Sequence, residues 1–351
     1  LEVDARALAC ELLGRSAGAC GSARLAAALD DQDPSVRIAA ARGLARRGDP
    51  VALRALVRRL EATANDPEPE AQDERDAMTE ALVAIATATA ADTRRSTLEL
   101  LAAGCDGAAA PVRLAGARVL REVAGPEHAE HMSLLVQDPS PAVRRAAVAA
   151  LARMGAGSAE MLHLALADED AAVRIAAATA LGEAPSARAL PDLERLLGDD
   201  DAGVRAACVR AVGALPPEAL GDCATRARVE RLLGGALGDV APVAIAAVEA
   251  FERMGGGLAL APVRGVIGHP DPEVVQSAVR CLQRHGAEED VQALLPLLGH
   301  PHWAVRADAI QAFSERRMRS ALPPVLRRLE LEQDEFVRDV LLRALARLEE
   351  G

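Results

Sequence analysis

Lysine and tyrosine are absent from this chain, and aromatic residues are rare. All 40 basic residues among the 351 are arginine, and the aromatic residues are three Phe and one Trp. A phosphate-binding loop ending in Gly-Lys-Ser/Thr, a Schiff-base lysine and the lysine of a protein kinase each need a residue that the sequence does not contain. These enzyme classes are therefore excluded.

Long apolar runs and paired cysteines are also missing. No stretch reaches the roughly 18 apolar residues of a membrane span, and no basic-then-apolar leader opens the chain. The six cysteines lie far apart without CxxC spacing, which predicts small core residues in a reducing compartment. They are Cys10, Cys20, Cys105, Cys208, Cys223 and Cys281. The absence of Lys and Tyr is typical of AT-poor codons, so we expect a cytoplasmic protein from a GC-rich bacterium.

Net charge and core composition limit the fold and the partners further. The formal net charge of −12 opposes non-specific binding to nucleic acid or to an anionic membrane, provided that the charge is evenly spread. Half of the residues are hydrophobic, and most of these are Ala, Leu and Val. Such a core suits thin layers of closely packed helices better than a β-sandwich or barrel, which needs β-branched and aromatic residues.

A repeated segment organises the whole sequence. The pattern Asp-Pro-Ser-Val-Arg-Ile-Ala-Ala-Ala that starts at Asp33 recurs in related form from Asp138, Asp170 and Asp201. The position of the Val-Arg arginine, which we call the anchor, recurs at intervals of 30–32 or 38–39 residues. The anchors are Arg6, Arg37, Arg75, Arg113, Arg144, Arg174, Arg205, Ala244, Val275, Arg306 and Arg338. A fixed period of this length predicts a solenoid of stacked units.

Each unit has the pattern of a helical hairpin. An Asp or a Pro-containing turn caps a first helix, small residues follow at spacings of three and four, and a Gly ends it. A second amphipathic helix follows, for example over residues 52–60, 192–197 and 291–298. The sequence therefore predicts one all-α solenoid over residues 1–351, with about ten helical hairpins and a leading helix. We expect insertions near 65–76, 87–93 and 215–226, the first of them as a solvated acidic loop leading into a helix.

These repeats resemble the HEAT repeat, in particular the short variety of phycobilin-lyase-like proteins. The resemblance implies that the Val-Arg helices line the concave face of a curved stack. It also implies that the repeating Asp and Arg bond between neighbouring repeats. Asp33 and Arg37, Asp170 and Arg174, Asp201 and Arg205, and Asp334 and Arg338 would then have a structural role. This ladder should be interrupted at Ala244 and Val275.

The exposed face of the first helices is predicted to carry excess positive charge. Positions five and nine residues after each anchor lie one turn apart on the same helix face. They hold eleven Arg and six Glu, a balance of +5 in a chain of −12. Besides Arg15, the arginines are Arg42, Arg46, Arg118, Arg153, Arg210, Arg253, Arg280, Arg284, Arg343 and Arg347. Such a face would attract an acidic peptide or helix; alternatively, these charges belong to an ordinary solvated face.

Trp303 is a second candidate for partner binding. It lies where a turn enters a first helix, a place that seldom needs an indole for packing. Isolated tryptophans are common binding hot spots, although they also fill cores.

Catalytic sites are not apparent in the sequence. Deoxyhypusine hydroxylase, which is built from similar repeats, uses His-Glu pairs, and none of the seven His here is followed by Glu. His128 with His131, and His300 with His302, lack a third metal ligand in sequence. We therefore expect a non-catalytic scaffold or adaptor without a cofactor, which binds an acidic protein segment. The alternatives are a nucleic-acid-binding solenoid and a subunit of a HEAT-like lyase or hydrolase.

Overall fold

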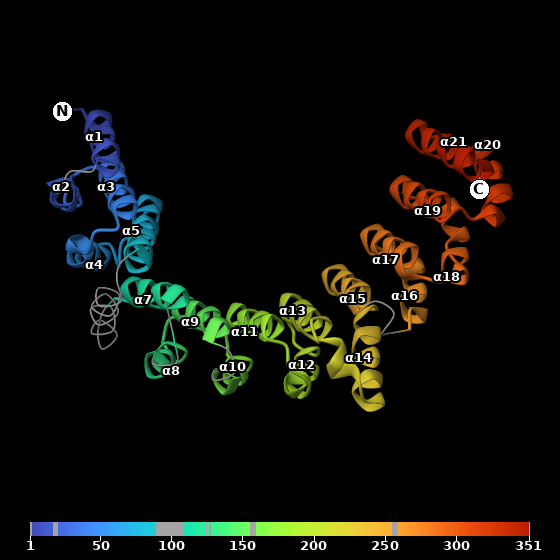
Figure 1. The fold of residues 1–351 in the computed structure, drawn as a ribbon, viewed down its shortest axis with the longest axis horizontal. Helices are drawn as coiled ribbons and strands as arrows, with labels where there is room; N and C mark the ends of the chain where they lie inside the picture. The colour runs from blue at the N-terminus through green and yellow to red at the C-terminus, as the bar shows by residue number, and fades with distance from the viewer. Residues whose placement is uncertain are drawn as a thin grey trace. The chain divides into compact units, whose positions relative to one another are not determined.

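The computed structural model describes residues 2–16, 20–88, 109–123, 125, 128–154, 159–254 and 259–350. Every regular element in these ranges is an α-helix or a 3-10 helix, and no strand occurs among them (Figure 1). The prediction of an all-α solenoid is confirmed. Residues 89–93 of the predicted insertion near 87–93, and Cys105, lie outside the described residues.

The chain divides into two compact units, Leu1–Ala180 and Leu181–Gly351, with helix α11 (Ala171–Glu183) running across the division. We call the helices that carry an anchor the Val-Arg helices. In unit 1 they are α1 (Val3–Arg15), α3 (Pro34–Arg47), α5 (Pro69–Ala88), α7 (Ala110–Val123) and α9 (Pro141–Met154). Its second helices are α2 (Cys20–Ala28), η1 (Pro50–Ala52), α4 (Leu53–Ala62), α8 (Ala129–Leu135) and α10 (Ala159–Ala165). Consecutive Val-Arg helices pack on one another.

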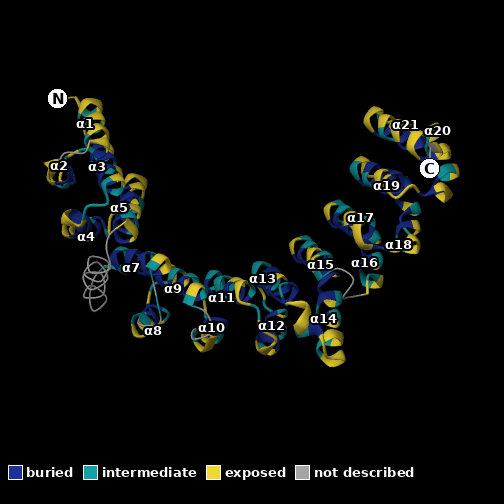
Figure 2. Ribbon diagram, in the orientation of Figure 1, coloured by how far each residue is buried: buried dark blue, intermediate teal, exposed yellow. Residues whose placement is uncertain are grey.

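Unit 2 repeats this arrangement. Its Val-Arg helices are α13 (Ala202–Gly213), α15 (Ala241–Met254), α17 (Pro272–His285), α19 (Trp303–Glu315) and α21 (Glu335–Glu350). Its second elements are η4 (Ala187–Ala189), α12 (Leu190–Leu196), η5 (Pro217–Leu220), α14 (Cys223–Ala236), α16 (Ala261–Gly265), η7 (Val266–Gly268), α18 (Glu288–Gln292), η8 (Leu295–Gly299), η9 (Arg319–Ala321) and α20 (Leu322–Leu331). Within each unit, buried residues gather where helices face their neighbours (Figure 2).

The anchors occupy a constant place in the fold. Each is the fourth residue of its helix, except Arg75, which is the seventh residue of α5. Helix α5 begins already at Pro69, so most of the segment 65–76 is helical and Glu74 is buried. The expectation of a solvated loop was therefore wrong beyond residue 68. Proline suits the first turn of a helix because the N–H groups there have no partner within the helix.

Small residues let the helices approach closely. A Cβ added to Gly14 of α1 would lie 2.6 Å from the Cα of Gly43 in α3, so these two backbones are in contact. The two largest fully buried side chains are Phe251 and Phe313, both in unit 2. Three cysteines are buried as predicted, whereas Cys20 and Cys223 are exposed at the first positions of α2 and α14.

Candidate interaction surfaces

Several anchor arginines, buried or partly buried, connect one repeat to the next. The Nη1 atom of Arg144 donates to the carbonyls of Asp138 and Pro139 in its own turn, at 2.9 and 3.3 Å. Its Nε and Nη2 atoms donate to the two carboxylate oxygens of Asp168 in the next repeat, both at 2.8 Å. Arg205 with Asp239 and Arg306 with Glu332 repeat this geometry at 2.7–2.8 Å. Bidentate pairs of this kind are strong and directional.

The aspartates expected to form this ladder have a different role. Asp33, Asp170, Asp201 and Asp334 each accept a backbone N–H from the first turn of their own helix, at 2.9–3.1 Å. None of the four forms an ion pair within the described ranges. The carboxylate that reaches the previous repeat stands two residues earlier, as Asp31 and Asp168 do, because the cap's own carboxylate is occupied by the helix start. Acids spaced two residues apart, such as Asp31 with Asp33 and Asp168 with Asp170, were the sequence signal for this second position.

Histidine replaces the acid wherever the anchor arginine is missing. The anchors Ala244 and Val275 are each followed 25 residues later by His269 and His300, the spacing that separates Arg113 from Asp138. The Nδ1 atoms of these histidines accept the N–H groups of Asp271 and His302, at 3.0 and 3.1 Å. Asp168 accepts the N–H of Asp170 in the same way. The imidazole thus holds the turn without placing a carboxylate opposite an apolar anchor.

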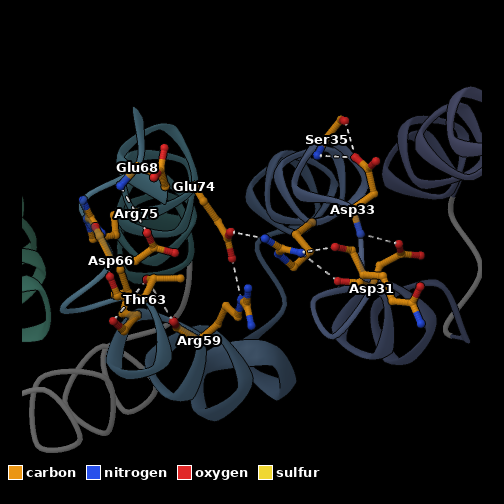
Figure 3. Close-up of polar contacts among 12 residues, drawn as sticks. Asp31, Asp33, Ser35, Arg59, Thr63, Asp66, Glu68, Glu74 and Arg75 are labelled. Carbon is orange, nitrogen blue, oxygen red and sulfur yellow. Dashed lines mark hydrogen bonds and ion pairs between the residues drawn. The ribbon is translucent and has the colours of Figure 1, made fainter. Parts of the chain in front are cut away.

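Two glutamates accept two arginines each. Glu74 receives Nη2 of Arg37 at 2.7 Å and also pairs with Arg59 (Figure 3). Burial raises the pKa of Glu74, but these hydrogen bonds outweigh it and hold the pKa below its usual range. Glu332 accepts hydrogen bonds from Arg306 and Arg328. Burial alone would raise the pKa of Glu332, but these bonds and the N–H of Asp334 lower it to about 2. Both sites therefore hold an ionised carboxylate and stabilise the repeat interface.

The predicted partner-binding arginines differ from the ladder arginines in exposure. Side chains of Arg144, Arg205 and Arg306 are 9–16% exposed. Five face arginines are 41–76% exposed and pair with a neighbouring acid: Arg118 with Asp76, Arg153 with Glu122, Arg280 with Asp308, Arg284 with Glu252, and Arg343 with Asp339. Arg42, Arg46, Arg210, Arg253 and Arg347 are exposed and have no ion pair to another described residue. Of these two sets, only the face arginines are accessible to a partner.

Unit 2 brings two of the predicted residues together in an open groove of about 520 Å³ between α17 and α19. Arg280, Arg284 and Arg316 line it with Asp308 and Glu315. Arg316 is fixed by donating to the carbonyl of Gly286 at 2.8 Å. Burial raises the pKa of Asp308 above its usual value, although Gln276 and Arg280 counteract this effect. The groove is polar and carries both signs of charge.

Unit 1 contains a groove of the opposite character. It lies across α1, α3 and α5, with Glu11, Asp73, Asp76 and Glu80 against one arginine, Arg42. Four carboxylates and one guanidinium give a formal balance of −3, so the expected Arg-rich face does not include this part of the chain. The charge count used only the positions five and nine residues after each anchor. It therefore missed Asp73, two residues before the anchor Arg75, and Asp76, directly after it.

Trp303 is exposed and forms an aromatic pair. It is 46% exposed and meets the ring of Phe336, itself 58% exposed, edge-on at 5.4 Å between centroids. The ring of His302 stacks on Trp303 at 6.1 Å. Trp303 is therefore not a core residue.

Metal and membrane features are limited in the described part of the chain. There, no three His, Cys, Asp or Glu side chains converge as a metal site. None of the helices found there is both long and apolar enough to span a bilayer.

Comparisons with known proteins agree with the repeat pattern. The sequence profile described as HEAT repeats matches residues 2–83, 158–252, 232–313 and 262–346, and a further HEAT repeat profile matches residues 131–158. No curated protein sequence matches the chain.

Several known structures share the fold. YibA of Escherichia coli is 21% identical over 78% of this chain and 95% of its own, with a TM-score of 0.51. Kap121p is 13% identical over 97% of this chain and 42% of its own, with a TM-score of 0.60. A homology model of the AP-3 complex is 10% identical over 100% and 73% of the two chains, with a TM-score of 0.59. At these identities the likeness concerns the fold alone.

Proposed function

The chain belongs to the HEAT repeat family, and from this premise we propose that it is a non-catalytic scaffold that binds an acidic segment of a protein partner. The proposed surface is the exposed side of α17, α19 and α21 in unit 2. Arg280 and Arg284 in the groove, with Arg343 and Arg347 on α21, are the proposed contacts.

The observation that supports this proposal is the exposure of these arginines. Arg280, Arg284 and Arg343 are 56–76% exposed, each with a single acidic neighbour. Exposed ion pairs contribute only about 0–1 kcal/mol, so a partner carboxylate can replace the neighbour at little cost. The buried ladder arginines cannot be exchanged in this way, because removing one partner of a buried pair leaves an uncompensated charge.

The test compares two variants with the same change in net charge. R280Q/R284Q/R343Q/R347Q removes the proposed contacts, and R188Q/R231Q/R319Q/R327Q removes four exposed arginines of the second elements in the same unit. The probe is a fluorescein-labelled twelve-residue peptide of alternating Glu and Ala, followed by fluorescence anisotropy. At about 0.5 kcal/mol per contact, roughly 2 kcal/mol in total, we expect the first variant to bind on the order of thirtyfold more weakly and the control to bind like the wild type.

A contrary outcome is equally clear. Equal weakening in both variants would show a non-specific charge effect and refute the proposed surface. A duplex DNA probe that binds more tightly than the peptide, with a steep loss of affinity between about 50 and 200 mM salt, would favour the nucleic-acid alternative. If the peptide result holds, recovery of binding proteins from the native host with the same pair of variants identifies the partner.

A further inference from the structure

An apolar pocket lies at the C-terminal ends of α13 and α15 in unit 2. It has a volume of about 270 Å³, and Leu215, Pro216, Pro217 and Leu220 form one wall of it. Met254, the last residue of α15, lines it from another helix. The pocket is separate from the groove between α17 and α19, with which it shares no lining residue.

The inserted segment 215–226 builds this pocket. Leu215 and Leu220 are 5% and 3% exposed, so both ends of the short wall are anchored in the core. Pro216 is extended and η5 follows it directly. Asp222 then caps α14 by accepting the N–H of Thr225 at 2.8 Å. Two consecutive prolines between buried leucines have few backbone conformations available, so the wall is largely formed before any ligand arrives.

Two arginines with free guanidinium groups line the same pocket. Arg226 comes from α14 and Arg253 from α15; both are exposed, and neither has an ion pair within the described residues. The Nη1 atom of Arg253 lies 3.8 Å from where a Cβ on Gly213 would be, close to the backbone end of α13. The site therefore combines an apolar wall with two arginines that have no acidic partner in the part of the chain that the structure describes.

We propose that this pocket binds the C-terminal residue of a protein partner, with an aliphatic side chain against the wall and the α-carboxylate between Arg226 and Arg253. A C-terminal residue carries a carboxylate and an apolar side chain on the same carbon atom, which is the combination that the pocket presents. An internal Asp or Glu would leave the apolar wall unused. The volume is below the roughly 300–1,000 Å³ of pockets for drug-sized ligands, so it fits one terminal residue and not a long acyl chain.

The test uses peptides that differ only at the terminus. The probe is fluorescein-Gly-Ser-Gly-Ser-Ala-Leu with a free carboxylate, and its C-terminal amide and a version ending in Ser are the comparisons. We expect the acid to bind the full chain at least tenfold more tightly than the amide, since arginine–carboxylate bonds are charge-assisted and bidentate. R226Q and R253Q should each remove most of the difference between acid and amide.

Two further variants show whether the peptide occupies the pocket or only its charged surroundings. R231Q removes an exposed arginine from the same helix α14 outside the pocket, and we expect it to bind like the wild type. A214F fills the pocket from the half-buried C-cap position of α13 and should weaken the binding of both Leu peptides. Thermal unfolding shows whether the variant is folded.

The proposal is overturned if acid and amide bind equally, if R226Q and R253Q bind like the wild type, or if no binding tighter than about 1 mM is seen. Tighter binding of decanoate than of the Leu peptide would also overturn it, because the ligand would then be a small amphipathic acid. Binding of the Glu-Ala peptide tests the other surface. If R280Q/R284Q/R343Q/R347Q changes the binding of that peptide or fails to change it, the binding of the Leu peptide to this pocket is unaffected.

Discussion

The interruption of the ladder at Val275 and His300 can be repaired by a double substitution. We expect V275R/H300D to create a missing connection between repeats, although V275R alone should be strongly destabilising. Arg144 and Arg306 occupy the same fourth helical position as Val275 and reach both their own turn and the next repeat. Val275 itself is fully buried.

The geometry of the intact connections sets the expected energies. V275R loses the burial of a valine, about 1.5–3 kcal/mol, and introduces a guanidinium where the following turn offers histidine instead of a carboxylate. We therefore expect V275R to lower the free energy of unfolding by about 2–4 kcal/mol. H300D keeps an acceptor for the N–H of His302, as Asp168 does for Asp170, and should cost less than about 1 kcal/mol.

The double variant should recover much of the loss. Hydrogen bonds to charged groups contribute about 1.5–3 kcal/mol, so we expect a coupling energy of about 2 kcal/mol between the two substitutions. For a cooperative unit of about 170 residues this corresponds to roughly 4–8 °C in Tm. The coupling is obtained from urea unfolding of the wild type, both single variants and the double variant.

Trp303 is the only tryptophan and lies in unit 2, so its fluorescence reports the unfolding of the unit that carries both substitutions. The control is V275R/H285D, which makes the same charge change at an exposed histidine at the end of α17. A coupling below about 0.5 kcal/mol, or one equal to that of the control, would refute the pairing of positions 275 and 300 as the basis of the interrupted ladder.

Two other predictions concern buried groups. E332Q should lower the free energy of unfolding by about 2–4 kcal/mol at neutral pH, because Arg306 loses its charged partner. Since the pKa of Glu332 is lowered to about 2 in the folded state, its contribution is complete above the unfolded value of about 4.3 and disappears as the pH falls toward 2. Urea titrations of wild type and E332Q should converge over that range, and a constant difference would contradict this reasoning. Burial raises the pKa of Cys208 to about 12 and that of Cys281 to about 11. A thiol reagent applied to the native protein at pH 8 should therefore modify the exposed Cys20 and Cys223 first. Equal rates of modification at these four cysteines would argue against the packing described.

The fold was predictable because one short pattern has a constant structural place. The anchor is the fourth residue of nearly every Val-Arg helix, so its position indicates which face of the helix is buried. The intervals between anchors indicate where each helical hairpin begins and ends. The segment 65–76 was misjudged because its acidic, proline-containing composition is typical of loops. Burial of Glu74 depends on Arg37, an arginine 37 residues earlier, and no local pattern shows such a contact.

The candidate surfaces were only partly predictable. Periodic counting identified Arg280 and Arg284, which share a groove, but not Arg316, which follows α19 and also lines the groove. The pocket beside Arg253 is lined by Leu215, Pro216, Pro217 and Leu220, which lie outside the repeated pattern on which the counting was based. Charge was also overcounted, because exposed arginines on one helix lie beside acids from the next, as Arg280 does beside Asp308.

Arginine occupies two kinds of position in this chain, the anchors and the exposed helix face, and Ala244 and Val275 show that the two vary independently. Where the anchor is not arginine, the position 25 residues later is not an acid, and the histidine there makes only the backbone contact. An aspartate retained there would keep a half-buried carboxylate without its cation, which is costly. The exposed arginines of the same helices, Arg253 and Arg280, are nevertheless present. Because exposed side chains of this kind contribute little to stability, Arg253 and Arg280 can exchange their present neighbours for the ligands that we propose.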